Sequence, residues 1–101
     1  MSTIHVSDQA ARWYKEELNL NEGDSIRFFA RYSSGGGLHP GFSLGIAVEK
    51  PRHPADQTEV SGIQFFMEDH DYWYLKGHQL HVDIVDEGQD IEYRYTEISN
   101  P

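Results

Sequence analysis

The chain has 101 residues, no cysteine and a formal charge of −9, from eight basic and seventeen acidic residues. This length predicts one domain spanning residues 1–101, with about 60–70% of the unfolded surface buried on folding. The lack of cysteine excludes disulfides, thiolate metal sites and a cysteine nucleophile. The acidic balance argues against a nucleic acid partner, because Lys and Arg supply the affinity for phosphates.

Targeting and membrane signals are not found. The opening residues lack the basic and apolar regions of a signal peptide, and no stretch reaches the ~18 apolar residues of a membrane span. We therefore expect a cytoplasmic protein without membrane contact.

The first third of the chain predicts a short strand, a helix and a longer strand. Residues 4–6 can form the short strand, and Ser7 is a candidate N-cap for an amphipathic helix over residues 8–18. After a turn over residues 19–24, apolar residues alternate over residues 26–32, as in a half-buried strand.

The remainder alternates strands with turns. Further strands are predicted over residues 42–48, 60–67, 79–85 and 91–96. Residues 49–58 contain two prolines and are expected to be a surface loop. Residues 70–75 are expected to form a short helix that Gly77 closes. The fold class is therefore mainly β (α+β), an antiparallel β roll or sandwich with one N-terminal helix and one short helix.

Three consecutive glycines separate two of these strands. A phosphate-binding loop needs a helix after its glycines, whereas here a strand follows, so nucleotide binding is disfavoured. Two interpretations stay open: a flexible connection between strands, or a loop whose backbone lines a ligand or partner site. The second interpretation assigns the site to Gly35, Gly36, Gly37, Leu38 and His39.

Metal binding and catalysis both require particular residue types in particular patterns. His81 and Asp83 share one face of their predicted strand, and His39 lies beside the glycines, so these three are the candidate ligands for a divalent metal. No cysteine or helical His-x-x-x-His supports a tight zinc site. No serine lies in a nucleophile elbow, so we expect no enzymatic activity.

Several segments together resemble the HesB/IscA-like family of A-type iron–sulfur carrier domains. The opening Ile4-His5-Val6-Ser7-Asp8-Gln9-Ala10-Ala11 is similar to that family's first strand and helix. Residues 35–44 resemble its glycine-rich loop and following strand, and residues 65–68, 74–77 and 80–83 resemble its later elements. The resemblance covers almost the whole chain and implies an accessory protein of iron–sulfur biogenesis.

The departures from that family concern the cluster ligands. An ungapped alignment places the family's loop cysteine on Gly37, and its Cys-Gly-Cys tail has no counterpart. Clusters are held chiefly by thiolates, so no iron–sulfur cluster is expected, and a divalent metal is the one cofactor that stays possible. Two functions stay open: a non-enzymatic accessory protein that binds a protein partner or forms a homo-oligomer, or a divalent-metal-binding protein using His and carboxylate ligands.

Overall fold

The computed structural model describes residues 2–34, 38–88 and 90–98. These residues form seven strands and three helical segments, of which η1 and η2 are 3₁₀ helices. In chain order the elements are β1 (Ile4–Val6), α1 (Asp8–Glu17), β2 (Ser25–Tyr32), β3 (Phe42–Val48), β4 (Pro54–Val60), β5 (Ile63–Glu68), η1 (Asp69–Leu75), β6 (His78–Val85), η2 (Asp86–Gly88) and β7 (Asp90–Glu97). The mainly β, α+β class is confirmed.

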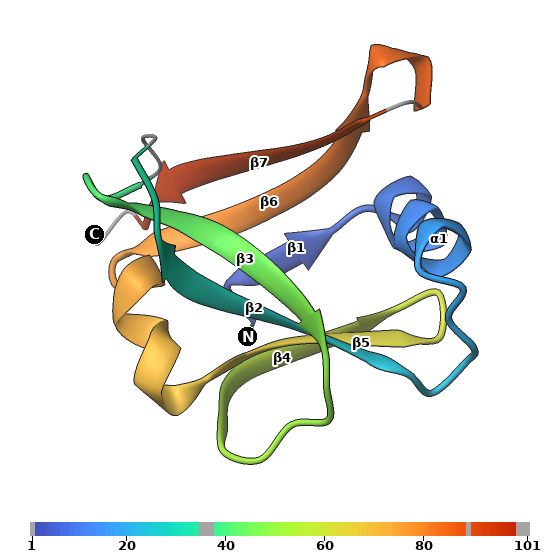
Figure 1. Ribbon diagram of the computed structural model, residues 1–101, viewed down its shortest axis with the longest axis horizontal. Helices are drawn as coiled ribbons and strands as arrows, with labels where there is room; N and C mark the ends of the chain where they lie inside the picture. The colour runs from blue at the N-terminus through green and yellow to red at the C-terminus, as the bar shows by residue number, and fades with distance from the viewer. Residues whose placement is uncertain (1, 35–37, 89, 99–101) are drawn as a thin grey trace.

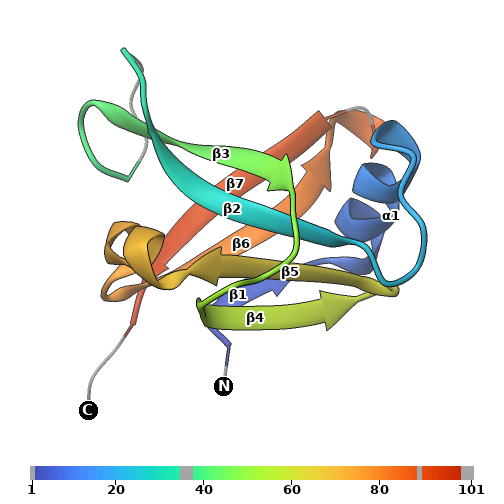
Figure 2. The same cartoon turned by 60° about the horizontal axis from the view of Figure 1, so that its bottom comes forward.

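The strands form two sheets that face each other across the core. One has three strands in the order β1-β6-β7, and the other has four in the order β3-β2-β5-β4. Helix α1 lies at one end of this two-layered structure and η1 at the other (Figure 1). Figure 2 shows β3 and β4 at the two borders of the four-stranded sheet.

The strand pairings are mainly antiparallel, as expected from sequence, but two of them are parallel. Strand β1 pairs in parallel with β6, and β2 pairs in parallel with β5. The other three pairings are antiparallel. Alternation of apolar residues fixes which side chains face the core, but it carries no information on the direction of the neighbouring strand.

The predicted loop over residues 49–58 is wrong in its second half, where strand β4 begins at Pro54. A proline is compatible with β4 because the strand lies at a sheet edge, where a missing amide costs no ladder hydrogen bond. The predicted strand 60–67 is divided by a two-residue turn at Ser61 and Gly62, whose φ angles are 52° and 81°. Such angles suit a tight β-hairpin of the mirror-image type.

The predicted helix is confirmed with small changes at its C-terminal end. Ser7 accepts a hydrogen bond from the Ala10 amide at 3.1 Å and so caps α1. Tyr14 is buried as the helical spacing predicts, but Leu18 is the C-cap residue and is 38% exposed. Leu20, beyond the helix, fills the core instead.

The core joins both sheets and the helix. The rings of Phe28 on β2 and Phe65 on β5 stack at a centroid distance of 5.9 Å, and the Tyr14 ring packs at 5.9 Å from Phe65. Leu80 and Val82 of β6 close the opposite side. Burial of each large apolar side chain contributes about 1.5–3 kcal/mol to folding.

Gly35, Gly36 and Gly37 lie outside the described residues, so the structure does not test their conformation. Over the described ranges, no helix is long and apolar enough to cross a membrane.

Candidate protein-binding surface

An exposed group of aromatic rings lies where the β2–β3 hairpin meets η1. Tyr32 and Phe42 face each other across the hairpin with ring centroids 4.9 Å apart. The Phe42 ring stands nearly perpendicular to Trp73 of η1 at 5.1 Å, and His39 lies 5.6 Å from Trp73. Tyr32 is 86% exposed and Trp73 is 46% exposed. We call Tyr32, His39, Phe42 and Trp73 the aromatic surface.

A buried tyrosine supports the aromatic surface from below. Tyr74 is fully buried, and its hydroxyl accepts a hydrogen bond from the Leu38 amide at 3.2 Å. Its carbonyl oxygen lies 3.0 Å from Nε2 of His39, which donates to it. The Tyr74 ring also packs edge-on against Tyr95 of β7 at 6.1 Å. The exposed rings therefore rest on an ordered base, so little side-chain entropy would be lost on binding.

The position of η1 is fixed by an ion pair to the four-stranded sheet. Asp71 in η1 accepts a hydrogen bond of 2.6 Å from Nη2 of Arg27 on β2. Nη1 of Arg27 donates to Glu49 at 3.2 Å, and the guanidinium lies over the Phe29 ring at 5.1 Å. Asp71 is almost fully buried, so this pair is shielded from solvent and orients the segment that carries Trp73.

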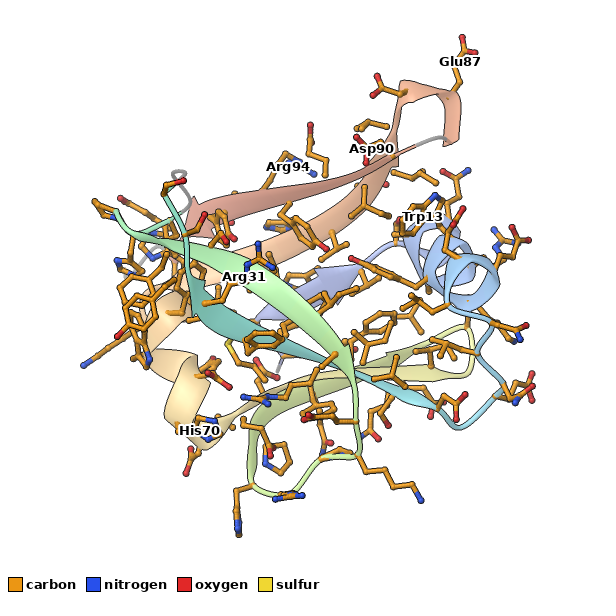
Figure 3. The ribbon with its side chains drawn as sticks, in the orientation of Figure 1. Trp13, Arg31, His70, Glu87, Asp90 and Arg94 are labelled. Atoms are coloured by element: carbon orange, nitrogen blue, oxygen red, sulfur yellow. The ribbon has the colours of Figure 1, made fainter. Side chains whose placement is uncertain are left out.

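The sequence-predicted site residues thus separate into two regions. His39 belongs to the aromatic surface, and Leu38 lies next to it in the chain, with its amide bonded to Tyr74. His81 and Asp83 instead lie on β6, where they line a shallow pocket of about 230 Å³ together with His5 and Arg94. Arg94 is seen on β7 in Figure 3.

The side chains of this second region already have hydrogen-bond or stacking partners of their own. Nε2 of His81 lies 2.9 Å from the Thr96 hydroxyl, and the ring stacks on His5 at 5.0 Å. Burial lowers the pKa of His81, and nearby His5 and Arg94 lower it further. The Ile84 amide donates to Asp83 at 2.8 Å and, with a hydrogen bond from Ser7, holds the pKa of that carboxyl below its ordinary value.

The expected metal-binding function is therefore wrong. No group of three or more His, Asp or Glu side chains within residues 2–34, 38–88 and 90–98 could hold a metal ion. The reason is topological: His39 lies beside η1, whereas His81 and Asp83 lie on β6 with partners of their own.

A groove of about 650 Å³ lies between α1 and the β6–β7 hairpin. Figure 3 labels two of its residues, Trp13 on the helix and Glu87 at the hairpin tip. Asp86 and Glu87 both have positive φ, which is uncommon for residues other than glycine. Sequence reasoning did not predict this groove, because it depends on where α1 packs relative to a distant hairpin.

Sequence reasoning also did not connect the members of the aromatic surface. Tyr32 ends β2 and Phe42 begins β3, so the antiparallel pairing of these two strands places them opposite each other. The sequence gives no indication that Trp73 joins them, because Trp73 lies in a segment about thirty residues further along the chain.

Comparison with known proteins shows the family. No protein-family model matches the chain. A protein of Bacillus subtilis named pyruvate dehydrogenase inhibitor is 39% identical over 90 residues, which cover 89% of this chain and 95% of the relative. The chain belongs to the family of that protein. Uncharacterized proteins of Staphylococcus saprophyticus and Staphylococcus haemolyticus are 34% and 31% identical, each over 89% of this chain and 95% and 94% of their own lengths.

The expected membership of the HesB/IscA-like family is wrong, and with it the expected role in iron–sulfur assembly. The relatives point to a different family, and no match to an iron–sulfur carrier was found. The resemblance rested on short glycine, capping and alternating patterns. Gly77, for example, has φ of 81°, so local backbone geometry alone favours glycine there.

The expectation that the chain is not an enzyme agrees with the comparison. The Bacillus relative is named for the inhibition of an enzyme, not for a reaction of its own.

Proposed function

We propose that this chain is a non-enzymatic regulatory protein that binds and inhibits a pyruvate dehydrogenase. The observation that carries the proposal is the 39% identity to the Bacillus subtilis pyruvate dehydrogenase inhibitor over nearly the full length of both chains. An inhibitor of an enzyme can act by covering a surface of that enzyme, so the proposal requires a protein-binding surface.

The aromatic surface is the region we assign to this contact, with Leu38 and His39 as its loop residues. Aromatic side chains are enriched at interfaces and supply much of the binding energy, because they bury a large area with few rotatable bonds. Trp73 combines partial exposure with packing against Phe42 and His39, as expected of a preorganised anchor. The rest of the chain is strongly acidic, which favours a partner with basic groups around an apolar centre.

The test uses purified full-length chain and the pyruvate dehydrogenase complex of the same organism. Pyruvate-dependent reduction of NAD is measured against increasing concentrations of the chain, and binding is measured separately by surface plasmon resonance. We expect saturable inhibition, with the binding and inhibition midpoints in agreement. If the chain neither binds nor inhibits when present in large molar excess, the proposed function is overturned.

The surface assignment is tested separately with Trp73→Ala. Truncation of an interface anchor typically costs about 2 kcal/mol or more, so we expect the dissociation constant to rise at least tenfold. The matched control is Trp13→Ala, which removes the other tryptophan, at the opposite end of the molecule. Equal inhibition by wild type and the Trp73 variant would leave the function standing and overturn the assignment of this surface.

A further inference from the structure

The described strands have four sheet edges, and three of them carry features that discourage pairing with another strand. Strand β7 alternates charged residues, β4 carries Pro54, Asp56 and Glu59, and β1 has only three residues. Short length, proline and charge are the usual means by which proteins protect such edges. The fourth edge, β3, has none of these.

Strand β3 is long, uncharged and unpaired on one side. Its sequence is Phe-Ser-Leu-Gly-Ile-Ala-Val, and among the described strands it pairs only with β2. Figure 2 shows it at the outer border of the four-stranded sheet. An exposed apolar edge of this length is a template for another strand.

The hydrogen-bonding phase of β3 determines which backbone groups are available. The Ser33 amide donates to the Gly41 carbonyl at 3.0 Å, so Gly41 directs its polar groups toward β2. In an antiparallel ladder the direction alternates from residue to residue. The amides and carbonyls of Leu44 and Ile46 therefore point toward the free edge.

We propose that β3 pairs with β3 of a second copy of this chain, antiparallel and with the two-fold axis at Gly45. Gly45 is the central residue of the strand, so this register uses its full length. It places Leu44 opposite Ile46 of the second copy, the two residues whose backbone groups point outward. The hydrogen-bonding phase is compatible with this symmetric register, and the length of β3 favours it over the shorter registers.

The side chains of this register are self-complementary. Phe42 lies opposite Val48 of the second copy, and Ser43 lies opposite Ala47. Val48 is 54% exposed in the single chain and gains an apolar neighbour on pairing. Cross-strand apolar pairs contribute about 0.2–1 kcal/mol each.

Charge explains why a second copy fits here and not at β7. Two chains of formal charge −9 repel each other, so they can approach most easily through a surface without charged side chains. Strand β3 offers such a surface over all seven of its residues, whereas β7 carries Asp90, Glu92, Arg94 and Glu97.

The experiment is sedimentation equilibrium of the full chain over a wide concentration range, combined with amide hydrogen exchange. We expect a monomer–dimer equilibrium in which the Leu44 and Ile46 amides become protected as the dimer forms. A wild-type chain that is monomeric at all concentrations would overturn the proposal. So would protection of these two amides that appears only when pyruvate dehydrogenase is added, since that would assign the edge to the enzyme.

Paired charge substitutions test the register. Ser43→Lys with Ala47→Lys places like charges opposite each other twice in the dimer, and we expect the dissociation constant to rise at least tenfold. Ser43→Glu with Ala47→Glu should have the same effect alone, and mixing the two variants should restore a dimer, because lysines then face glutamates. Failure of the mixture to associate would overturn this register.

The matched control is Ala55→Lys with Glu59→Lys, which has the same spacing of four residues on the exposed side of β4. We expect this variant to dimerise as the wild type does. An equal loss of dimer in the control would overturn the assignment to β3. Circular dichroism of each variant separates loss of pairing from loss of folding.

Discussion

The carboxylate of Asp56 accepts two hydrogen bonds from Thr3, one from its amide and one from its hydroxyl, each 2.6 Å long. Thr3 precedes β1 and Asp56 lies in β4, so the contact joins the two sheets at one side of the core. The Tyr72 hydroxyl, 2.8 Å from the Thr3 hydroxyl, completes the group. Polar contacts therefore hold the two sheets together on this side of the molecule, whereas the outer edge of β3 pairs with no other described strand.

Replacement of Asp56 by Asn should lower the free energy of unfolding at pH 7 by about 1.5–3 kcal/mol, the usual value of hydrogen bonds to a charged group. Burial raises the pKa of Asp56, but the hydrogen bonds from Thr3 outweigh it and hold the pKa below the ordinary 3.8. As the pH falls, the Asp56 carboxyl therefore takes up a proton at a higher pH in the unfolded chain than in the folded chain. The contribution of Asp56 to the free energy of unfolding is fully present above about pH 4, and it is lost as the pH falls through the pKa of Asp56 in the folded state.

Urea denaturation at a series of pH values measures this effect. The wild type should lose stability more steeply below pH 4 than Asp56→Asn does. Parallel pH profiles for the two proteins would contradict the role given to this carboxylate.

The hydroxyls of Tyr14 and Tyr93 are hydrogen-bonded to each other within the core. Burial raises the pKa of both phenols above the ordinary 10, so both are neutral at pH 7. Either Tyr→Phe change leaves one buried hydroxyl without this partner, at a cost of about 1–3 kcal/mol. The double change removes both polar groups and should cost less than the sum of the single changes.

A double-mutant cycle by thermal or urea unfolding checks this expectation. A coupling energy near zero would show that the two hydroxyls do not depend on each other. Tyr95→Phe is a useful comparison, because Tyr95 lies on the same strand and packs against Tyr74 rather than Tyr14.

The elements that were predictable from sequence depend on local interactions. Ser7 marks the start of α1 because its side chain can reach the Ala10 amide only from an N-cap position. The strand β2 was predictable because Ile26 and Phe28 lie two residues apart on one face of it, with Arg27 on the other. Gly77 was predictable as the end of the short helix, since φ of 81° suits glycine.

The features that were not predictable depend on contacts between distant segments. The residues of β4 predict a loop, because they include Pro54 and several polar residues. Their pairing with β5 is what makes them a strand. The aromatic surface needs the β2–β3 hairpin and Trp73 to meet, which the packing of η1 decides. Short patterns also misled the family assignment, because glycines and caps recur wherever the same local geometry is needed.

A pH-dependent contribution to stability is expected from His81. Burial, then His5 and Arg94, lower its pKa from the ordinary 6.5, so the unfolded chain binds this proton more readily than the folded one. The free energy of unfolding should therefore fall as the pH drops below about 6.5, and level off below the pKa of the folded state. His81→Gln should remove this part of the pH dependence, and Arg94→Gln should reduce it. An unchanged slope in His81→Gln between pH 7 and 5 would contradict the prediction.

Gly45→Ala should destabilise the chain although its backbone conformation suits alanine. A Cβ atom at this position would lie 2.6 Å from the Phe29 ring, closer than real contacts allow. Overpacking of this kind costs about 1–3 kcal/mol, more than the 0.4–1 kcal/mol gained by restricting the unfolded chain. The melting temperature should therefore fall, and Phe29→Leu combined with Gly45→Ala should recover part of the loss by making room for the methyl group. A Gly45→Ala protein as stable as the wild type would show that the Phe29 ring moves aside at little cost.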